Sequence, residues 1–217
     1  CKDTVVNIVD ATATVFTNIT LDKTLLPTAT RFHYQFNLRD FSKIIQTFKC
    51  TDAKTFRANK MGLARLWVHE CHRVWKDRLI REEDNMKYMQ FINTGLANFQ
   101  LKTEDCHAEP LVFTQFVAVC KGFNEPTLMP VVSMEDLNNV LVEKLEQYNN
   151  EKENMDLVLF DQAIEHVCRI TRIIDTPRGS ALLVGVGGIW AEAIDAKQHQ
   201  IKTVIKRLAI SSRKESG

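Results

Sequence analysis

The sequence predicts a mainly α-helical protein that runs into an incomplete α/β phosphate-loop module. Apolar residues recur at helical spacing over most of the 217 residues. One short apolar, branched run near residue 180 ends in a glycine-rich turn, as a buried parallel strand does before a helix. The composition is that of a globular protein, because 45% of the residues are hydrophobic and 25% are charged.

Four helices are predicted from stripes of apolar residues three or four positions apart. The first two stripes are Leu38, Phe41, Ile45 and Phe48, then Leu63, Leu66, Trp67, Cys71 and Val74. Ser133 and Asp136 form a capping-box-like start for the third, which continues through Leu137, Val140, Leu141, Leu145 and Tyr148. The fourth stripe follows a polar spacer and ends before Pro177 and Gly179. Its members are Leu157, Phe160, Ile164, Val167, Ile170 and Ile174.

Three other segments favour extended chain. Residues 32–36 alternate in polarity, as a brief extended stretch would. Residues 109–130 contain three prolines around an apolar centre, so we expect a partly buried connector, with a strand as one interpretation. Residues 180–184 form the predicted parallel strand. A change of composition near 125–133 predicts the boundary between two units.

Charge and cysteine content argue against several classes of protein. Lys and Arg number 28 and Asp and Glu 27, so the net charge of +1 does not favour binding to nucleic acid or membrane through the overall field. The longest apolar run, 181–191, is shorter than the ~20 residues that span a bilayer. The six scattered cysteines indicate reduced thiols of a cytosolic protein. We expect no secretory leader, and the start at Cys1 indicates a piece of a longer protein.

The glycine-rich turn at 185–188 is a candidate phosphate loop. A nucleotide-binding loop has Gly, four residues, Gly, Lys and then Ser or Thr, so that backbone amides, a cation and a Mg²⁺-binding hydroxyl surround the phosphates. Counted from Gly185, those last three positions hold Trp190, Ala191 and Glu192. The spacing therefore favours a glycine turn without a ligand.

A second pattern, His69-Glu70-Cys71-His72, looks like a metal site. A zincin helix places its histidines four apart so that both face the metal, whereas His69 and His72 are three apart. The favoured interpretation is a packed amphipathic helix with a charged outer face.

A third candidate is Arg39, in the predicted first helical turn Asn37-Leu38-Arg39-Asp40. A cation is unfavourable there unless it faces an anion, and a guanidinium binds phosphate with two parallel hydrogen bonds. Two interpretations stay open: Arg39 binds phosphate, or it forms a surface salt bridge with Asp40 or a neighbour.

The tail from 195 to 217 is basic, with six Lys and Arg against two Asp and Glu. A helix that binds nucleic acid or a membrane surface is one interpretation. The tail has no aromatic residue for base stacking or interfacial anchoring, so a solvated, partly disordered end is favoured.

Three segments, 26–40, 66–79 and 159–188, resemble the motor region of axonemal dynein heavy chains. They read LPTATRFHYQFNLRD, LWVHECHRVWKDRL and, in the third, LF, AIEHVCRI and ALLVGVGG. The resemblance covers residues 1–188 in consistent order. It implies a helical AAA+ lid followed by the incomplete α/β module.

The resemblance divides the chain between two AAA+ modules. Residues 1–125 would be the end of the third module with its helical lid, and residues 126–188 the beginning of the fourth. Residues 189–217 would be a divergent basic tail.

The resemblance also implies nucleotide-binding residues. Arg39 matches the lid arginine that senses nucleotide at the third module. In the fourth module, the residues that match positions near the adenine are Leu157, Val158 and Phe160. The residues that match the first half of the phosphate loop are Gly185, Val186, Gly187 and Gly188.

The departure from the family begins at Ile189, where the family continues with Ser-Gly, a basic residue and a polar pair. We expect no dynein resemblance over 189–217, and we interpret this tail as the product of alternative splicing, a retained intron or a frame change.

The implied parent is an ATP-driven, minus-end-directed microtubule motor of the ciliary or flagellar axoneme, within the cytoplasm and cytoskeleton. Its cofactors are ATP or ADP with Mg²⁺, and its partners are the other AAA+ modules, dynein intermediate and light chains, and microtubules. For this chain alone we expect no ATPase activity, no stably bound nucleotide, and no nucleic-acid or membrane partner. The alternatives are a non-catalytic helical interaction module and a basic nucleic-acid-binding helix.

Overall fold

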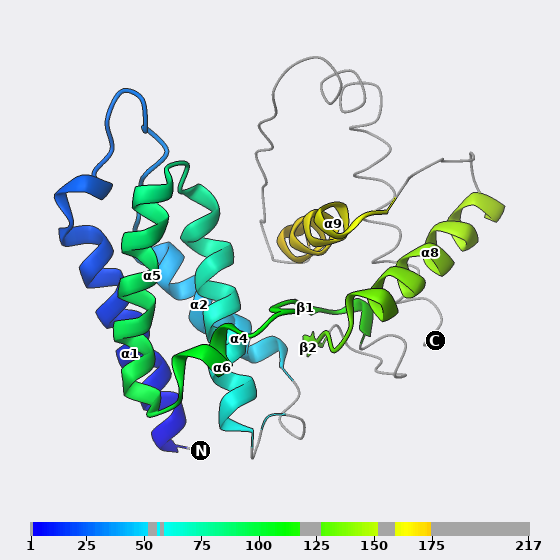
Figure 1. The fold of residues 1–217 in the computed structure, drawn as a ribbon, viewed down its shortest axis with the longest axis horizontal. Coiled ribbons are helices and arrows are strands. Elements are labelled where there is room, and N and C mark those ends of the chain that lie inside the picture. Colours follow the sequence, from blue (N-terminus) through cyan, green and yellow to red (C-terminus); the bar gives the residue numbers. More distant parts are fainter. Residues whose placement is uncertain (1, 52–55, 57–58, 118–126, 152–158, 175–217) are drawn as a thin grey trace. The chain divides into compact units, whose positions relative to one another are not determined.

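The computed structural model describes residues 2–51, 56, 59–117, 127–151 and 159–174. The chain divides into two compact units, Cys1–Leu111 and Val112–Gly217. Helices predominate in the described residues of both units, which confirms the predicted mainly α class (Figure 1).

The first unit is a helical bundle (Figure 1). Its elements are α1 (Lys2–Leu21), η1 (Lys23–Leu25), α2 (Leu38–Thr47), η2 (Phe48–Cys50), α4 (Lys60–Val74), η3 (Lys76–Arg78), α5 (Glu82–Leu96), η4 (Ala97–Phe99) and α6 (Thr103–His107). The helices predicted from the first two apolar stripes are therefore confirmed as α2 and α4.

The extended stretch predicted at 32–36 is wrong. This segment makes a turn, in which the Tyr34 N–H donates to the Arg31 carbonyl at 3.1 Å and the Gln35 N–H to the His33 carbonyl at 2.8 Å. Tyr34 is buried and Gln35 exposed, but Phe32 is exposed as well, so burial does not alternate along the segment as it would in a strand. No strand pairs with the segment in the described structure.

Helices α1 and α5 lie side by side in the core of the first unit (Figure 1). The indole of Trp67, on α4, is fully buried, and its Nε1–H donates to the Thr12 hydroxyl at 2.9 Å. Gly95 of α5 lies at the same place: a Cβ there would come within 2.8 Å of both Trp67 Cη2 and Val15 Cγ2. Real Cβ atoms do not approach that closely, so the packing requires glycine.

The residues of the second unit that the structure describes form a two-stranded antiparallel sheet and two helices. These elements are β1 (Phe113–Thr114), β2 (Met129–Pro130), α8 (Met134–Glu151) and α9 (Asp161–Ile174). Phe113 pairs with Pro130 and Thr114 with Met129, so the 109–130 connector contributes strands as one interpretation of it expected. The hydrophobic core is formed by residues that flank the two strands and by residues of α8 and α9. They are Val112, Phe116, Val131, Leu137, Leu141, Ile164 and Cys168.

The fourth stripe predicts a helix that includes Phe160, but α9 begins at Asp161, directly after it, and the Phe160 carbonyl accepts the Ile164 N–H at 3.0 Å. The two compact units divide after Leu111, ahead of β1, which pairs with β2 and packs with α9. The boundary predicted near 125–133 stays a prediction. The predicted strand at 180–184 lies outside the described residues.

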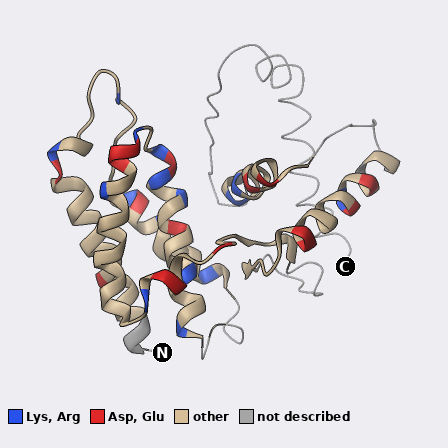
Figure 2. Ribbon diagram, in the orientation of Figure 1, with Lys and Arg blue, Asp and Glu red and all other residues tan. Residues whose placement is uncertain are grey.

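The described helices also differ in charge. Figure 2 shows the described part of α1 almost without charged residues, whereas α4 and α5 carry both signs. Within the described residues, we find no helix with the length and apolar character needed to cross a membrane. The cysteines that the structure describes, at 50, 71, 106 and 168, are free thiols.

Candidate functional site

The first turn of α2 is fixed by a reciprocal capping box. The Asn37 side-chain oxygen accepts the N–H groups of Arg39 (2.9 Å) and Asp40 (3.3 Å). In return, the Asp40 carboxylate accepts the Asn37 N–H at 3.3 Å. Backbone donors that the helix leaves unpaired are satisfied in this way, so the local sequence Asn-Leu-Arg-Asp determines where α2 begins.

Asp40 is buried and pairs with Arg78 of η3. The Arg78 Nη2 lies 2.7 Å from Asp40 Oδ1 and the Arg78 Nη1 2.8 Å from Asp40 Oδ2. Lys43 Nζ lies 3.6 Å from the same carboxylate. A buried carboxylate needs such partners, because its lost hydration is offset only by well-placed charges and hydrogen bonds.

A second cluster holds the turn that precedes α2. The Tyr34 hydroxyl donates to the Asp84 carboxylate at 3.0 Å and accepts the Ile80 N–H at 2.9 Å. Arg31 Nη1 lies 3.5 Å from Asp84 and donates to the Thr24 carbonyl at 2.7 Å. Burial of the ring, with a smaller contribution from the Asp84 carboxylate, raises the pKa of Tyr34. The cluster joins the turn to α5.

Arg39 is exposed, and although its backbone N–H donates to Asn37, its side chain makes no hydrogen bond or ion pair within the part of the chain that the structure describes. The salt bridge to Asp40 that one interpretation expected is wrong, because Arg78 and Lys43 take both carboxylate oxygens. The Arg39 guanidinium is therefore available to an anion, and phosphate binding by Arg39 stays a prediction.

The other predicted nucleotide-binding residues lie in the second unit's sequence. Phe160 is half-exposed, at 46%, directly before α9. The remaining ones lie outside the described residues: Leu157, Val158, Gly185, Val186, Gly187 and Gly188. The basic tail lies outside them as well.

The metal-like pattern on α4 is a packing and hydrogen-bonding cluster. The fully buried Glu70 carboxylate accepts from Arg73 Nη2 at 2.7 Å and from the Thr47 hydroxyl at 2.6 Å. The His72 ring stacks against His107, with ring centroids 6.0 Å apart. Among the described residues, no three side chains of metal-ligating type come together. Glu70 instead ties the end of α2 to α4.

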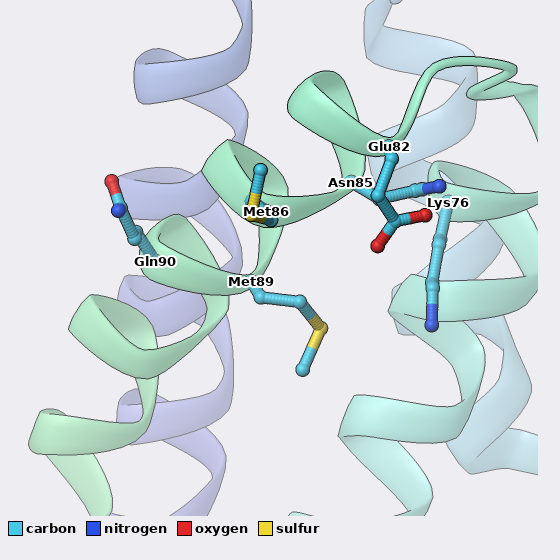
Figure 3. A pocket seen from close by; sticks show the side chains of 6 residues that line it. All are labelled: Lys76, Glu82, Asn85, Met86, Met89 and Gln90. Atoms are coloured by element: carbon cyan, nitrogen blue, oxygen red, sulfur yellow. The ribbon is translucent and has the colours of Figure 1, made fainter.

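A shallow hollow of about 460 Å³ lies elsewhere on the first unit, beside α5 (Figure 3). Figure 3 shows Met86, Met89 and Gln90 on successive parts of α5, and Lys76 on the side of η3. None of the sequence-predicted nucleotide-binding residues lines it.

Sequence reasoning did not single out Arg78, Tyr34 or Asp84 as parts of the site. Their charged partners lie 38 to 53 residues away along the chain, and no spacing rule connects residues at that separation. The Asn37 and Asp40 spacing was the available local signal, because it matches a capping box.

Comparison with known proteins gives two family matches in chain order. Residues 8–113 match the AAA+ lid domain, and residues 155–195 match the P-loop containing dynein motor region D4. Human dynein axonemal heavy chain 17 is 40% identical over 173 residues, which is 79% of this chain. The flagellar outer arm dynein beta chain of Chlamydomonas reinhardtii is 42% identical over 194 residues, or 86% of this chain.

The chain is homologous to a segment of the axonemal dynein heavy chains. It spans only 4% of the length of each of these two relatives. Human dynein axonemal heavy chain 6 gives a similar result, with 39% identity over 199 residues, 89% of this chain and 5% of the relative.

One expectation about the dynein segment is corrected. The match to motor region D4 continues to residue 195, so the resemblance does not end at residue 188. A family match reflects the pattern of the whole segment, and it does not supply the lysine that Ala191 replaces.

Proposed function

We propose that this chain is part of an axonemal dynein heavy chain. Residues 1–125 would be the C-terminal part of the third AAA+ module with its helical lid, and residues 126–188 the beginning of the fourth. The lid match over residues 8–113 and the helical bundle of the first unit support this assignment. The parent would be an ATP-driven microtubule motor of the ciliary or flagellar axoneme. Its partners would be its other AAA+ modules, intermediate and light chains, and microtubules.

In this proposal Arg39 is the lid residue that binds the phosphates of the nucleotide at the third module and so senses whether nucleotide is bound. The observation that carries it is the exposed Arg39 without an ion-pair partner in the described structure, on a turn that the capping box and Arg78 hold. A guanidinium at a helix start is favourable when it faces phosphate, to which it donates parallel hydrogen bonds. The remainder of the module would bind the ATP or ADP with its Mg²⁺.

Photolabelling tests this role in the complete heavy chain that carries the segment. Labelling with 8-azido-ATP, mapped to peptides of the module, gives an apparent affinity for wild type and for Arg39→Ala. We expect Arg39→Ala to weaken labelling about tenfold or more, the value of hydrogen bonds to a charged group. Arg81→Ala is the matched control, because Arg81 is an exposed arginine at the start of α5. Equal labelling of wild type and Arg39→Ala contradicts the proposal.

We also propose that the 217-residue chain alone neither hydrolyses ATP nor binds it stably. The residues after Gly188 do not fit a Mg²⁺-bound triphosphate, because Ala191 and Glu192 stand where a lysine and a hydroxyl are needed. Isothermal titration of the chain with ATP and Mg²⁺ is expected to give no heat of binding at micromolar concentrations. A micromolar dissociation constant contradicts this proposal and leaves the lid assignment intact.

A further inference from the structure

We propose that Arg78 is a positioning residue that sets the direction in which Arg39 faces the nucleotide phosphates. The proposal rests on the proposed role of Arg39. Arg78 lies on η3, 38 residues after its partner Asp40, and it does not itself reach the phosphate in this proposal.

Arg78 holds the chain on both sides of Arg39. Upstream, its Nη1 donates to the Gln35 carbonyl at 2.7 Å. Downstream, its two terminal nitrogens bind the two oxygens of Asp40, the residue that follows Arg39. Its guanidinium also lies over the Phe36 ring, 5.8 Å from the centroid. The first turn of α2 cannot rotate without breaking these contacts.

The position of Arg78 is itself fixed by the turn before α2. The His33 ring nitrogen lies 3.1 Å from the Arg78 carbonyl, and the Ile80 N–H donates to the Tyr34 hydroxyl at 2.9 Å. The Leu79 N–H closes η3 onto the Lys76 carbonyl at 2.8 Å. The two segments therefore hold each other, and Arg78 acts from a fixed point.

Arg78→Lys distinguishes the effect of the positive charge from the effect of the guanidinium geometry. It keeps the positive charge beside Asp40, but a single ammonium cannot bind both carboxylate oxygens and the Gln35 carbonyl in the planar arrangement of a guanidinium. If Arg78 only balances the charge of Asp40, Arg78→Lys should leave nucleotide affinity unchanged.

The test compares four complete heavy chains by 8-azido-ATP labelling of the module: wild type, Arg39→Ala, Arg78→Lys and the double variant. We expect Arg78→Lys to weaken labelling roughly three- to tenfold, since one or two charged hydrogen bonds are lost. In the Arg39→Ala background the same change should have no further effect, because Arg78 acts through Arg39. Asp40→Asn, which breaks the pair from its other side, should give the same non-additive loss.

Arg73→Lys is the matched structural control, because Arg73 also binds a buried carboxylate through two nitrogens but at the far end of α2. Urea unfolding of the 217-residue chain should show that both lysine variants lower stability, while only Arg78→Lys weakens labelling. Unchanged labelling of Arg78→Lys, or a loss that adds fully to that of Arg39→Ala, overturns the positioning role alone. Unchanged labelling of Arg39→Ala overturns the proposed function and the inference together.

Discussion

At each end of α2 a buried carboxylate pairs with an arginine, but the two pairs serve different purposes. At its start, Asp40 is 2% exposed and binds Arg78, which lies 38 residues along the chain. At its end, Thr47 donates to Glu70 of α4, a fully buried carboxylate that binds Arg73, also on α4. The first pair lies beside an exposed arginine, whereas the second lies in the helix packing. A buried carboxylate and an arginine can thus orient a surface residue or join two helices, depending on what neighbours them.

Glu70→Ala should have the largest effect on stability. It leaves the Arg73 guanidinium, whose side chain is only 10% exposed, without its carboxylate. We expect the free energy of unfolding to fall by about 3–5 kcal/mol, as when one partner of a buried pair is removed. Urea unfolding of the chain measures it, with exposed Glu83→Ala as the control. A cost below about 1 kcal/mol would show that the two ends of α2 do not differ as described.

Arg78→Ala should cost less, about 2–3 kcal/mol, because Lys43 remains near Asp40 and the Arg78 side chain is 28% exposed. The same urea experiment measures the loss. A cost greater than that of Glu70→Ala would reverse the order of the two ends.

Tyr34→Phe tests the turn before α2. The change removes a hydroxyl that both donates to Asp84 and accepts the Ile80 N–H. We expect a loss of about 1–2 kcal/mol, since the buried Asp84 carboxylate and the part-buried Ile80 N–H each lose a partner. Thermal and urea unfolding should agree, and no loss would mean that Arg31 alone suffices to hold Asp84.

Asn37→Ala removes the capping acceptor and should cost about 1 kcal/mol. Asn37→Asp, which keeps an oxygen in the same place, should recover most of it. Equal losses for the two variants would mean that the cap oxygen does not stabilise the start of α2.

Alkaline pH should weaken the start of α2 by a smaller and gradual effect. The pKa of Tyr34 is raised above its ordinary value of 10.0, so the folded chain favours the protonated phenol. Its contribution is therefore complete below pH 10.0 and falls as pH rises through the raised pKa. The stability difference between wild type and Tyr34→Phe should shrink above that pH. A difference that stays constant to pH 12 would contradict the raised pKa.

Helix positions follow from sequence because each apolar stripe is a local pattern, as at Leu63 to Val74 in α4. Polarity alone misled at 32–36, since burial of Tyr34 depends on Asp84, 50 residues away. Arg39 was found because a cation in a first helical turn is a local anomaly. Arg78 was not, because the segment from 65 to 81 contains several basic residues, and only the folded chain selects the one that pairs with Asp40.

Gly95 limits how this bundle tolerates change in another way. An added methyl group at that position would press at once on the indole of Trp67, a methyl of Val15 and, at 3.3 Å, the Ala11 carbonyl. Helices α1, α4 and α5 would have to separate to admit it. A substitution of Gly95 by any larger residue would therefore disturb the packing of the unit more widely than the loss of a single surface charge.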